Sequence, residues 1–396
     1  YNAEGKVEWA EGIGGTGDDD IKSIAETSDG GYIVGGYFRN SIDLGNGISL
    51  TNKGYEDGMI IKYNARGEVE WAEGIGGSYS DRITSVAETS DGGYIVGGNF
   101  SSSSIDLGNG ISLTNKGSYD GMLIKYSSNG EVEWAEEIGE SKDDYINTAS
   151  ETNDGGYIVG GDFYSSKIDL GNGKFLTNKT DNYIGMLLKY DCKGDIEWFQ
   201  QLEEIYTNKI NEVKECNDGG YIVGGNYFNS ITKGEKIELK NGISITTGGR
   251  YDGILIKYNN KGNMQWAKAI GGGDEDFISS VAESSDGGFI VGGYFYSSRI
   301  DLGNGISLTN KGSSDGMIIK YNATGEVEWA EGIGGTSGDH IESVIDTSDG
   351  GYIVGGYFES SSIDLGNGKS LTNKGSSDGL VLKIVDQAGV PEVQEL

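Results

Sequence analysis

The sequence predicts an all-β fold, a six-bladed β-propeller of four-stranded antiparallel blades. One motif, Gly-Gly-(Tyr/Phe)-Ile-Val-Gly-Gly, occurs six times, with copies that begin at Gly30, Gly92, Gly155, Gly219, Gly287 and Gly350. The six tryptophans keep the same period of about 63 residues: Trp9, Trp71, Trp134, Trp198, Trp266 and Trp329. Two unrelated markers with one period indicate a repeat protein, in which each copy adds one blade.

The second repeat shows the strands of a blade. Residues 83–89, 94–100, 122–126 and 132–138 are predicted as strands, here named a, b, c and d. A Ser-Asp-Gly-Gly turn joins a to b, as expected between antiparallel strands. Strands b and c are nearly continuous apolar runs, so both faces of the sheet should be covered. Neighbouring blades would provide that cover.

A longer insert, residues 105–113, separates strands b and c. It contains Asn109-Gly110 between apolar runs, which favours a tight hairpin because both turn residues need positive φ. Its Asp-Leu-Gly-Asn-Gly sequence lacks the acidic spacing of an EF-hand calcium loop. Each repeat is therefore expected to carry a small extra hairpin rather than a metal loop.

The chain ends suggest how the ring closes. Residues 7–13, which contain Trp9, match strand d, and the repeats stop after a strand c at 380–385. We predict that 7–13 pairs antiparallel with 380–385, so that the N-terminal strand closes the ring and removes two sheet edges. Residues 1–386 would form a single, monomeric propeller domain, and 387–396 a linker to a further domain. The absence of a starting Met indicates an excised or processed piece of a longer chain.

Composition narrows the function. The 396 residues contain 30 Lys and Arg against 62 Asp and Glu, a net charge of −32, which disfavours nucleic acid and anionic membranes as partners. No apolar run is long enough to cross a bilayer. Cys192 and Cys216 make no disulfide framework and lack CxxC spacing.

The repeat is similar to a known family. Residues 120–126, 129–134 and 154–161, which read DGMLIKY, NGEVEW and DGGYIVGG, resemble the bacterial SBBP family of β-propeller repeats. The resemblance covers about residues 1–386 and implies an exported or surface protein, with an extracellular location at the bacterial cell surface. That family's name implies seven blades, whereas this chain has six repeats.

The repeats differ at one face of the predicted propeller. The a–b turns barely vary, whereas the d–a loops and the starts of the b–c loops vary freely and share one face. Loops on a rigid scaffold commonly carry binding sites, although unconstrained loops also drift. Irregular tyrosines near this face are the ligand-binding candidates: Tyr37, Tyr79, Tyr164 and Tyr296. The regular Phe at the end of strand b and the tryptophans are expected to be packing residues.

One d–a loop position is acidic in five repeats, at Asp19, Asp81, Asp144, Asp276 and Asp339, and is Asn208 in the other. A ring of carboxylates would suit Ca²⁺, the only cofactor that the sequence suggests. The simpler interpretation is that each Asp accepts hydrogen bonds from turn N–H groups, and this is favoured.

Catalysis is not expected. The only histidine, His340, lies in a loop without a Ser or Cys partner for a triad, and 62 acidic residues make any carboxylate pair uninformative. The favoured function is a non-catalytic binding or adhesion module that recognises a glycan or protein through the variable face. A structural spacer in a multidomain surface protein and a carbohydrate-active hydrolase or lyase are the alternatives. The fourth repeat is the outlier, with a locally basic insert containing Lys233, Lys236, Lys240 and Arg250.

Overall fold

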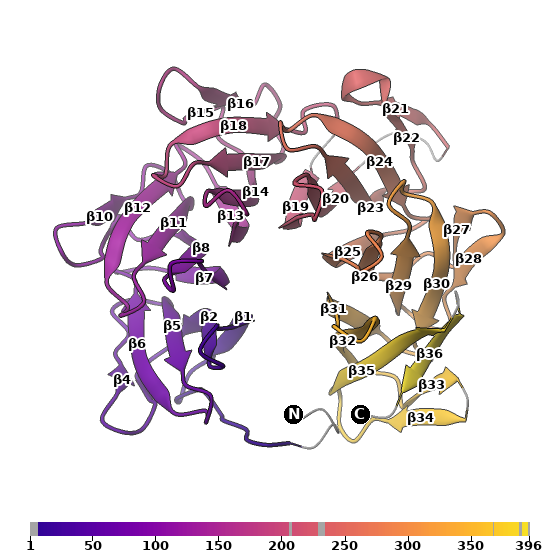
Figure 1. The fold of residues 1–396 in the computed structure, drawn as a ribbon, viewed down its shortest axis with the longest axis horizontal. Helices are drawn as coiled ribbons and strands as arrows, with labels where there is room; N and C mark the ends of the chain where they lie inside the picture. Colours follow the sequence, from indigo (N-terminus) through magenta and orange to yellow (C-terminus); the bar gives the residue numbers. More distant parts are fainter. Residues whose placement is uncertain (1–6, 206–207, 229–233, 367, 388–389, 395–396) are drawn as a thin grey trace. The chain divides into compact units, whose positions relative to one another are not determined.

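The computed structural model describes residues 7–205, 208–228, 234–366, 368–387 and 390–394. Contacts divide the chain into two compact units, residues 1–201 and 202–396, and each unit contains three four-stranded sheets (Figure 1). All pairings within these sheets are antiparallel. The all-β fold with six four-stranded antiparallel propeller blades is therefore confirmed. Within the described residues, no helix is long and apolar enough to span a membrane.

The first unit holds blades 1 to 3, each with a two-stranded hairpin inserted between its second and third strands. The strands are, for blade 1, β1 Asp20–Glu26, β2 Tyr32–Phe38, β3 Ile42–Asp43, β4 Ser49–Leu50, β5 Asp57–Tyr63 and β6 Val69–Ile75; for blade 2, β7 Asp81–Glu88, β8 Tyr94–Phe100, β9 Ser104–Asp106, β10 Ser112–Thr114, β11 Asp120–Tyr126 and β12 Val132–Ile138; for blade 3, β13 Asp144–Glu151, β14 Tyr157–Phe163, β15 Lys167–Asp169, β16 Phe175–Thr177, β17 Ile184–Tyr190 and β18 Ile196–Gln201.

The second unit holds blades 4 to 6 with the same plan. The elements are, for blade 4, β19 Asn208–Glu215, β20 Tyr221–Phe228, β21 Lys236–Glu238, the 3₁₀ turn η1 Lys240–Gly242, β22 Ser244–Thr246, β23 Tyr251–Tyr258 and β24 Met264–Ile270; for blade 5, β25 Asp276–Glu283, β26 Phe289–Phe295, β27 Arg299–Gly303, β28 Ile306–Thr309, β29 Asp315–Tyr321 and β30 Val327–Ile333; for blade 6, β31 Asp339–Asp346, β32 Gly351–Phe358, β33 Ser362–Gly366, β34 Lys369–Thr372, β35 Asp378–Gln387 and β36 Val390–Gln394.

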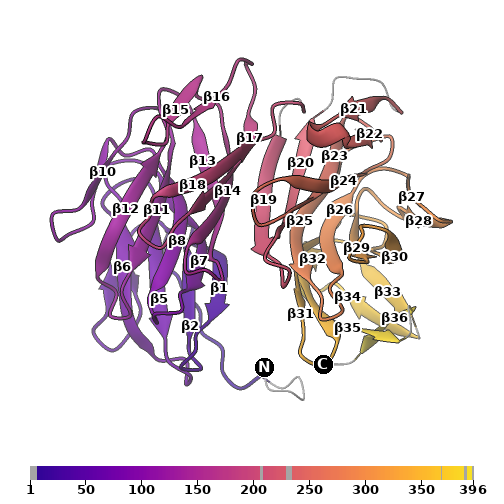
Figure 2. The same cartoon turned by 45° about the horizontal axis from the view of Figure 1, so that its top comes forward.

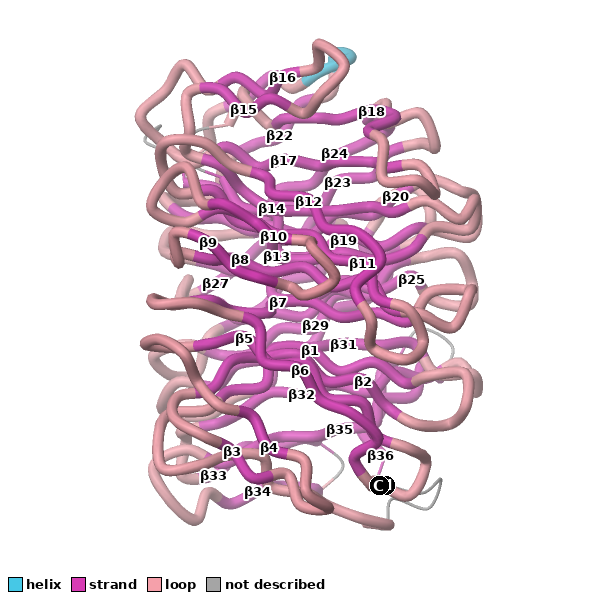
Figure 3. The backbone as a smooth tube through the Cα atoms, turned by 90° about the vertical axis from the view of Figure 1, so that its left-hand side faces the viewer, coloured by secondary structure: helices cyan, strands magenta, loops and turns pink. Residues whose placement is uncertain are grey.

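The strands of blade 2 lie where the alternation of the sequence places them, with ends that differ by at most two residues from the prediction. The predicted hairpin is β9–β10, and Asn109 (φ 52°) and Gly110 (φ 79°) both have positive φ as its turn requires. In the first unit the connections gather at the two ends of the strands (Figure 3). The end of each blade that carries its d–a and b–c connections is called the loop end below.

Blades within a unit pack face to face (Figure 2). The Gly-Gly of strand b makes room for the next blade, because a Cβ on Gly97 would lie 3.0 Å from Ile146 and 3.3 Å from Ala149. Each d-strand Trp then packs on the following blade: Trp71 stacks on Tyr126 and Trp134 meets Tyr157 edge-on, with ring centroids 6.5 and 5.5 Å apart. In the second unit Trp266 and Trp329 pack likewise on Phe289 and Tyr352. The packing role predicted for these tryptophans is confirmed at these four junctions.

A lysine of strand c fixes the a–b turn of every blade at the end opposite the loop end, and this lysine is buried in blades 1 to 5. In blade 2 Lys125 is 2% exposed, and its Nζ donates to Asp91 of the turn at 3.1 Å and to the Tyr126 carbonyl at 2.9 Å. Burial acts against the charged Asp91, but the Thr89, Gly93 and Lys125 donors outweigh it and lower the Asp91 pKa to about 2. The same pair joins Lys62 to Asp29, Lys189 to Asp154, Lys257 to Asp218, Lys320 to Asp286 and Lys383 to Asp349. These pairs explain why the Asp-Gly-Gly turn does not vary.

The C-terminal blade is completed differently from the prediction. β35 pairs on one side with β32 and on the other with β36, so residues 390–394, predicted as part of a linker, form the fourth strand. Val393 packs against the core of blade 6, and Lys369 Nζ donates to its carbonyl at 2.9 Å. Pro391 is tolerated because β36 is an edge strand. Residues 388–389 and 395–396 of the predicted linker lie outside the described residues.

The predicted pairing of residues 7–13 with 380–385 is therefore wrong, because β36 already occupies that edge of β35. Residues 7–13 form no strand. Trp9 nonetheless lies against blade 1, with ring centroids 5.7 Å from Tyr32 and 6.2 Å from Tyr63. Trp71 makes the same two contacts with the tyrosines of blade 2, so Trp9 takes the place of a d-strand Trp without its strand.

Candidate functional site

Aromatic side chains gather at the loop ends of the blades. They come from strand a, from strand b and the residue after it, and from the residue before strand c. In blades 2 and 3 Tyr119, Tyr145, Tyr183 and Tyr164 form a chain of neighbouring rings, with centroids 5.7, 6.0 and 5.1 Å apart. The Lys142 ammonium lies 4.0 Å from the centroid of Tyr164, a favourable cation–π arrangement. The predicted ligand residue Tyr164 therefore belongs to a larger cluster.

A second group in blades 5 and 6 is called the aromatic–histidine cluster, defined as Phe277, Tyr294, Tyr296, His340 and Tyr357. The His340 ring stacks on Tyr294 with centroids 3.7 Å apart and planes 3° from parallel. Phe277 also packs on Tyr294, with ring centroids 5.0 Å apart. Tyr296 is 41% exposed and stands edge-on to both Tyr294 and His340. The cluster thus presents one exposed ring supported by rings packed beneath it.

Hydrogen bonds fix the imidazole of this cluster. Nε2 of His340 is 3.0 Å from the Ser314 hydroxyl, and Nδ1 is 2.7 Å from the Tyr357 hydroxyl. Burial lowers the pKa of His340, although the nearby carboxylates of Glu359 and Asp339 act in the opposite direction. Burial likewise raises the pKa of Tyr294 to about 12. At neutral pH the stacked pair is therefore uncharged, with one imidazole nitrogen donating and the other accepting.

A hollow of about 350 Å³, called the polar hollow, adjoins this cluster. It is lined by Asn211, Asn226, Phe277, Ile278, Ser279, Tyr294 and Glu342. Asn226 exchanges two hydrogen bonds with the backbone of Ile278, and Asn211 Nδ2 donates to the Ile278 carbonyl at 2.7 Å. These bonds hold both amides in place. An aromatic wall with a few oriented polar groups is the usual composition of a small-ligand site.

The predicted ligand tyrosines lie at loop ends, but the structure does not bring them together. Tyr37, near the end of β2, has the Arg82 guanidinium 4.7 Å above its ring and donates to Asp20 at 3.3 Å. Tyr79 is 61% exposed, and within the described residues its ring contacts no other ring. Tyr164 and Tyr296 each belong to one of the clusters above. Their roles in binding stay a prediction.

The acidic residues of the d–a position accept hydrogen bonds from backbone N–H groups, as the turn interpretation expects. Asp81 is fully buried and accepts from the backbone N–H of Gly77, Ser101 and Ser102 and from the Ser102 hydroxyl, at 2.6–3.1 Å. Equivalent bonds hold Asp144, Asp276 and Asp339, and Asp19 accepts from Gly15 and Arg39. In the part of the chain that the structure describes, no three His, Cys, Asp or Glu side chains are grouped as a metal site. Both cysteines are free thiols.

A second buried acid begins strand c in several blades and was not predicted from the sequence. Asp120 begins β11, is fully buried and accepts from Lys116 N–H through Oδ2, but its Oδ1 has no hydrogen-bond partner. Burial, with the carboxylates of Glu137 and Asp144, raises the pKa of Asp120 to about 7. Asp57 and Asp315 occupy the same position, with raised pKa values for which burial is the main cause. The repeated Asp-Gly before strand c was the available signal.

The rings missed by the sequence are Phe277, Tyr294, Tyr119, Tyr145 and Tyr183. Tyr occupies the position of Tyr294 in three repeats and the shared position of Tyr119 and Tyr183 in three, and only the packing of blades brings residues of different repeats together. For Tyr145, Phe277 and Tyr294 the available signal was the alternation within strands a and b, because it directs these side chains away from the blade core.

Comparisons with known proteins find only distant similarity. The chain matches no protein-family model. It is 23% identical, over 90% of its length, to an uncharacterised WD repeat-containing protein of Acanthamoeba polyphaga mimivirus, and 20% identical, over 85%, to the regulatory protein FlaEY of Caulobacter vibrioides. It covers 31% and 36% of those two proteins, about a third of their length. Among solved structures it is similar to the Pan2 WD40 domain of Neurospora crassa, with 11% identity, a TM-score of 0.44 and coverage of 92% of this chain and 81% of that one.

Proposed function

We propose that this chain is a non-catalytic binding module of a bacterial surface protein that recognises a glycan through the loop ends of its blades. The observation that carries the proposal is the aromatic–histidine cluster beside the polar hollow. Tyr296 offers an exposed ring at low entropic cost, since its neighbours already fix it. Asn211 and Glu342 line the hollow next to it, and amide and carboxylate oxygens can accept from sugar hydroxyls.

The location at the cell surface rests on the resemblance to SBBP repeats. The net charge of −32 is compatible with a neutral glycan and disfavours polyanions at this cluster. The buried lysine–aspartate pairs and packed tryptophans make the blades a rigid support, on which a binding surface needs little reorganisation.

A glycan microarray and a panel of matrix proteins, probed with the whole chain, test the proposal. We expect glycan binding, and we expect Tyr296→Ala to weaken it by about tenfold, the loss of one aromatic contact. Tyr296→Phe keeps the ring and should retain most of the affinity. Neither variant should lower the free energy of unfolding by more than about 1 kcal/mol, because Tyr296 is partly exposed.

Three outcomes would contradict the proposal. Binding that is absent at high protein concentration would favour a structural spacer. Binding to matrix proteins alone would make the ligand a protein. Turnover of a polysaccharide would favour a hydrolase or lyase.

A further inference from the structure

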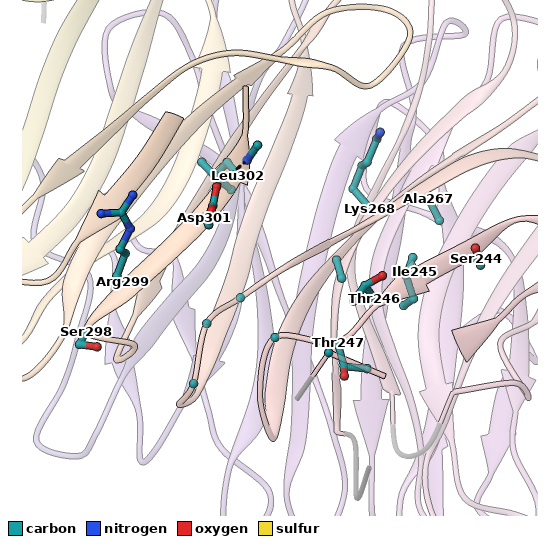
Figure 4. A pocket seen from close by; sticks show the side chains of 17 residues that line it. Ser244, Ile245, Thr246, Thr247, Ala267, Lys268, Ser298, Arg299, Asp301 and Leu302 are labelled. Atoms are coloured by element: carbon teal, nitrogen blue, oxygen red, sulfur yellow. Dashed lines mark hydrogen bonds between the residues drawn. The ribbon is translucent and has the colours of Figure 1, made fainter. Parts of the chain in front are cut away.

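An open groove of about 810 Å³ lies at the outer side of blades 4 and 5, between the hairpins β21–β22 and β27–β28 and along β24. Figure 4 shows Arg299 on one side of this groove and Lys268, with Ser244, Thr246 and Thr247, on the other. It is distinct from the polar hollow, which is lined by residues of the a and b strands of blades 4 to 6 and shares no lining residue with it. We call it the rim groove.

Small residues line the rim groove at the place where blade 2 carries an ion pair. In blade 2 Lys116 Nζ lies 2.9 Å from Glu137 Oε1. By position in the repeat, blade 4 has Gly248 in place of that lysine and Ala269 in place of that glutamate. Both residues line the groove. The volume that the pair fills in blade 2 is therefore left open in blade 4.

A second change reverses the charge of the groove. The residue two places after the blade Trp is acidic at Glu73, Glu136 and Glu331 but is Lys268 in blade 4. Arg299 stands across from it at the start of β27. Within the described residues neither Lys268 nor Arg299 forms an ion pair. Two unpaired cations at one groove are unusual in a chain with a net charge of −32.

We propose that the rim groove binds an anionic polysaccharide, whose carboxylate or sulfate groups pair with Lys268 and Arg299. Hydroxyl side chains of Ser244, Thr246 and Ser298 line the groove and match sugar hydroxyls. The lining contains no aromatic ring, and Ile245 is buried, so the groove offers little to the apolar side chains of a peptide. Asp301 also lines the groove, where its carboxylate accepts from Gly303 N–H and opposes an anion.

Titration of the whole chain with oligogalacturonate, and separately with a sulfated heparin oligosaccharide, tests the proposal and distinguishes carboxylate from sulfate. Lys268→Glu restores the residue of three other blades, so it should fold. It should weaken binding by about tenfold or more, the loss of one charge-assisted hydrogen bond. Asp301→Asn should strengthen binding, and added salt should weaken it.

Lys193→Glu, an exposed position in a turn of blade 3, is the charge-matched control and should leave the affinity unchanged. Tyr296→Ala should also leave it unchanged, which separates this site from the aromatic–histidine cluster. The proposal is overturned if neither oligosaccharide binds, if Lys268→Glu binds as well as wild type, if the control loses as much affinity, or if an acidic peptide such as poly-Glu binds more tightly.

Discussion

The stability of the first unit should depend on the protonation of Asp120, and Asp120→Asn tests this. The carboxyl is fully buried, one oxygen has no partner, and its pKa is raised from 3.8 to about 7. Each pKa unit corresponds to about 1.36 kcal/mol, so ionising the folded protein costs about 4 kcal/mol in total. Asn keeps an oxygen for the Lys116 N–H and cannot ionise.

The direction in which the stability changes with pH follows from proton binding. Between pH 4 and pH 7 the folded state holds a proton on Asp120 that the unfolded state has lost. The contribution of Asp120 is therefore fully present below its unfolded pKa and is lost as the pH rises through about 7. Between pH 5.5 and pH 8.0, a range above the pI of about 4.3, the free energy of unfolding should lose about 2 kcal/mol of the contribution of Asp120. Asp120→Asn should escape this loss.

Guanidinium unfolding of wild type and variant at pH 5.5 and 8.0 measures the difference. The stability of Asp120→Asn relative to wild type should increase by about 2 kcal/mol between the two pH values. Asp106→Asn, at an exposed hairpin carboxylate, is the matched control and should show no such change. A relative stability of Asp120→Asn that does not vary with pH would refute the reasoning. Ile184 occupies the equivalent position in blade 3, so an uncharged residue is compatible with this fold.

Two further predictions concern packing and the histidine. Trp134→Ala should lower the free energy of unfolding by about 3 kcal/mol, because it removes the ring packed on Tyr157; a loss below about 1 kcal/mol in denaturant unfolding would contradict an inter-blade role. Burial lowers the pKa of His340, so the stability that its neutral form contributes is present above pH 6.5 and is lost as the pH falls through its folded value. His340→Gln should therefore lose less stability than wild type when the pH falls from 7.5 to 5.5, and identical losses would show that His340 does not titrate as the structure implies.

The sequence was sufficient for the elements that repeat. Period-two alternation in residues 83–89 and 94–100 and the Asn109-Gly110 turn predicted strands and hairpin within two residues, because local chemistry determines them. The C-terminal strand was missed because residues 390–394 lack the Trp that the d strands of the other blades carry. Its pairing with β35 involves a segment outside the repeat, and repeat matching cannot find such a segment.

The candidate sites were less predictable for a related reason. Tyr296 could be identified because it departs from the repeat, but the stacking of His340 on Tyr294 joins two blades. The sequence shows Lys125 only as one residue of a strand. Nothing in it indicates that the ammonium is buried and donates to Asp91. The rim groove depends on the small residues Gly248 and Ala269, and their effect becomes visible only when the neighbouring hairpins are in place.

The most direct test of the account is a crystal structure of the whole chain with a glycan that the microarray identifies. The account predicts ordered sugar density against the exposed ring of Tyr296 and in the polar hollow, with hydrogen bonds to Asn211 or Glu342. Density at the opposite ends of the strands, beside the Asp-Gly-Gly turns, would contradict it.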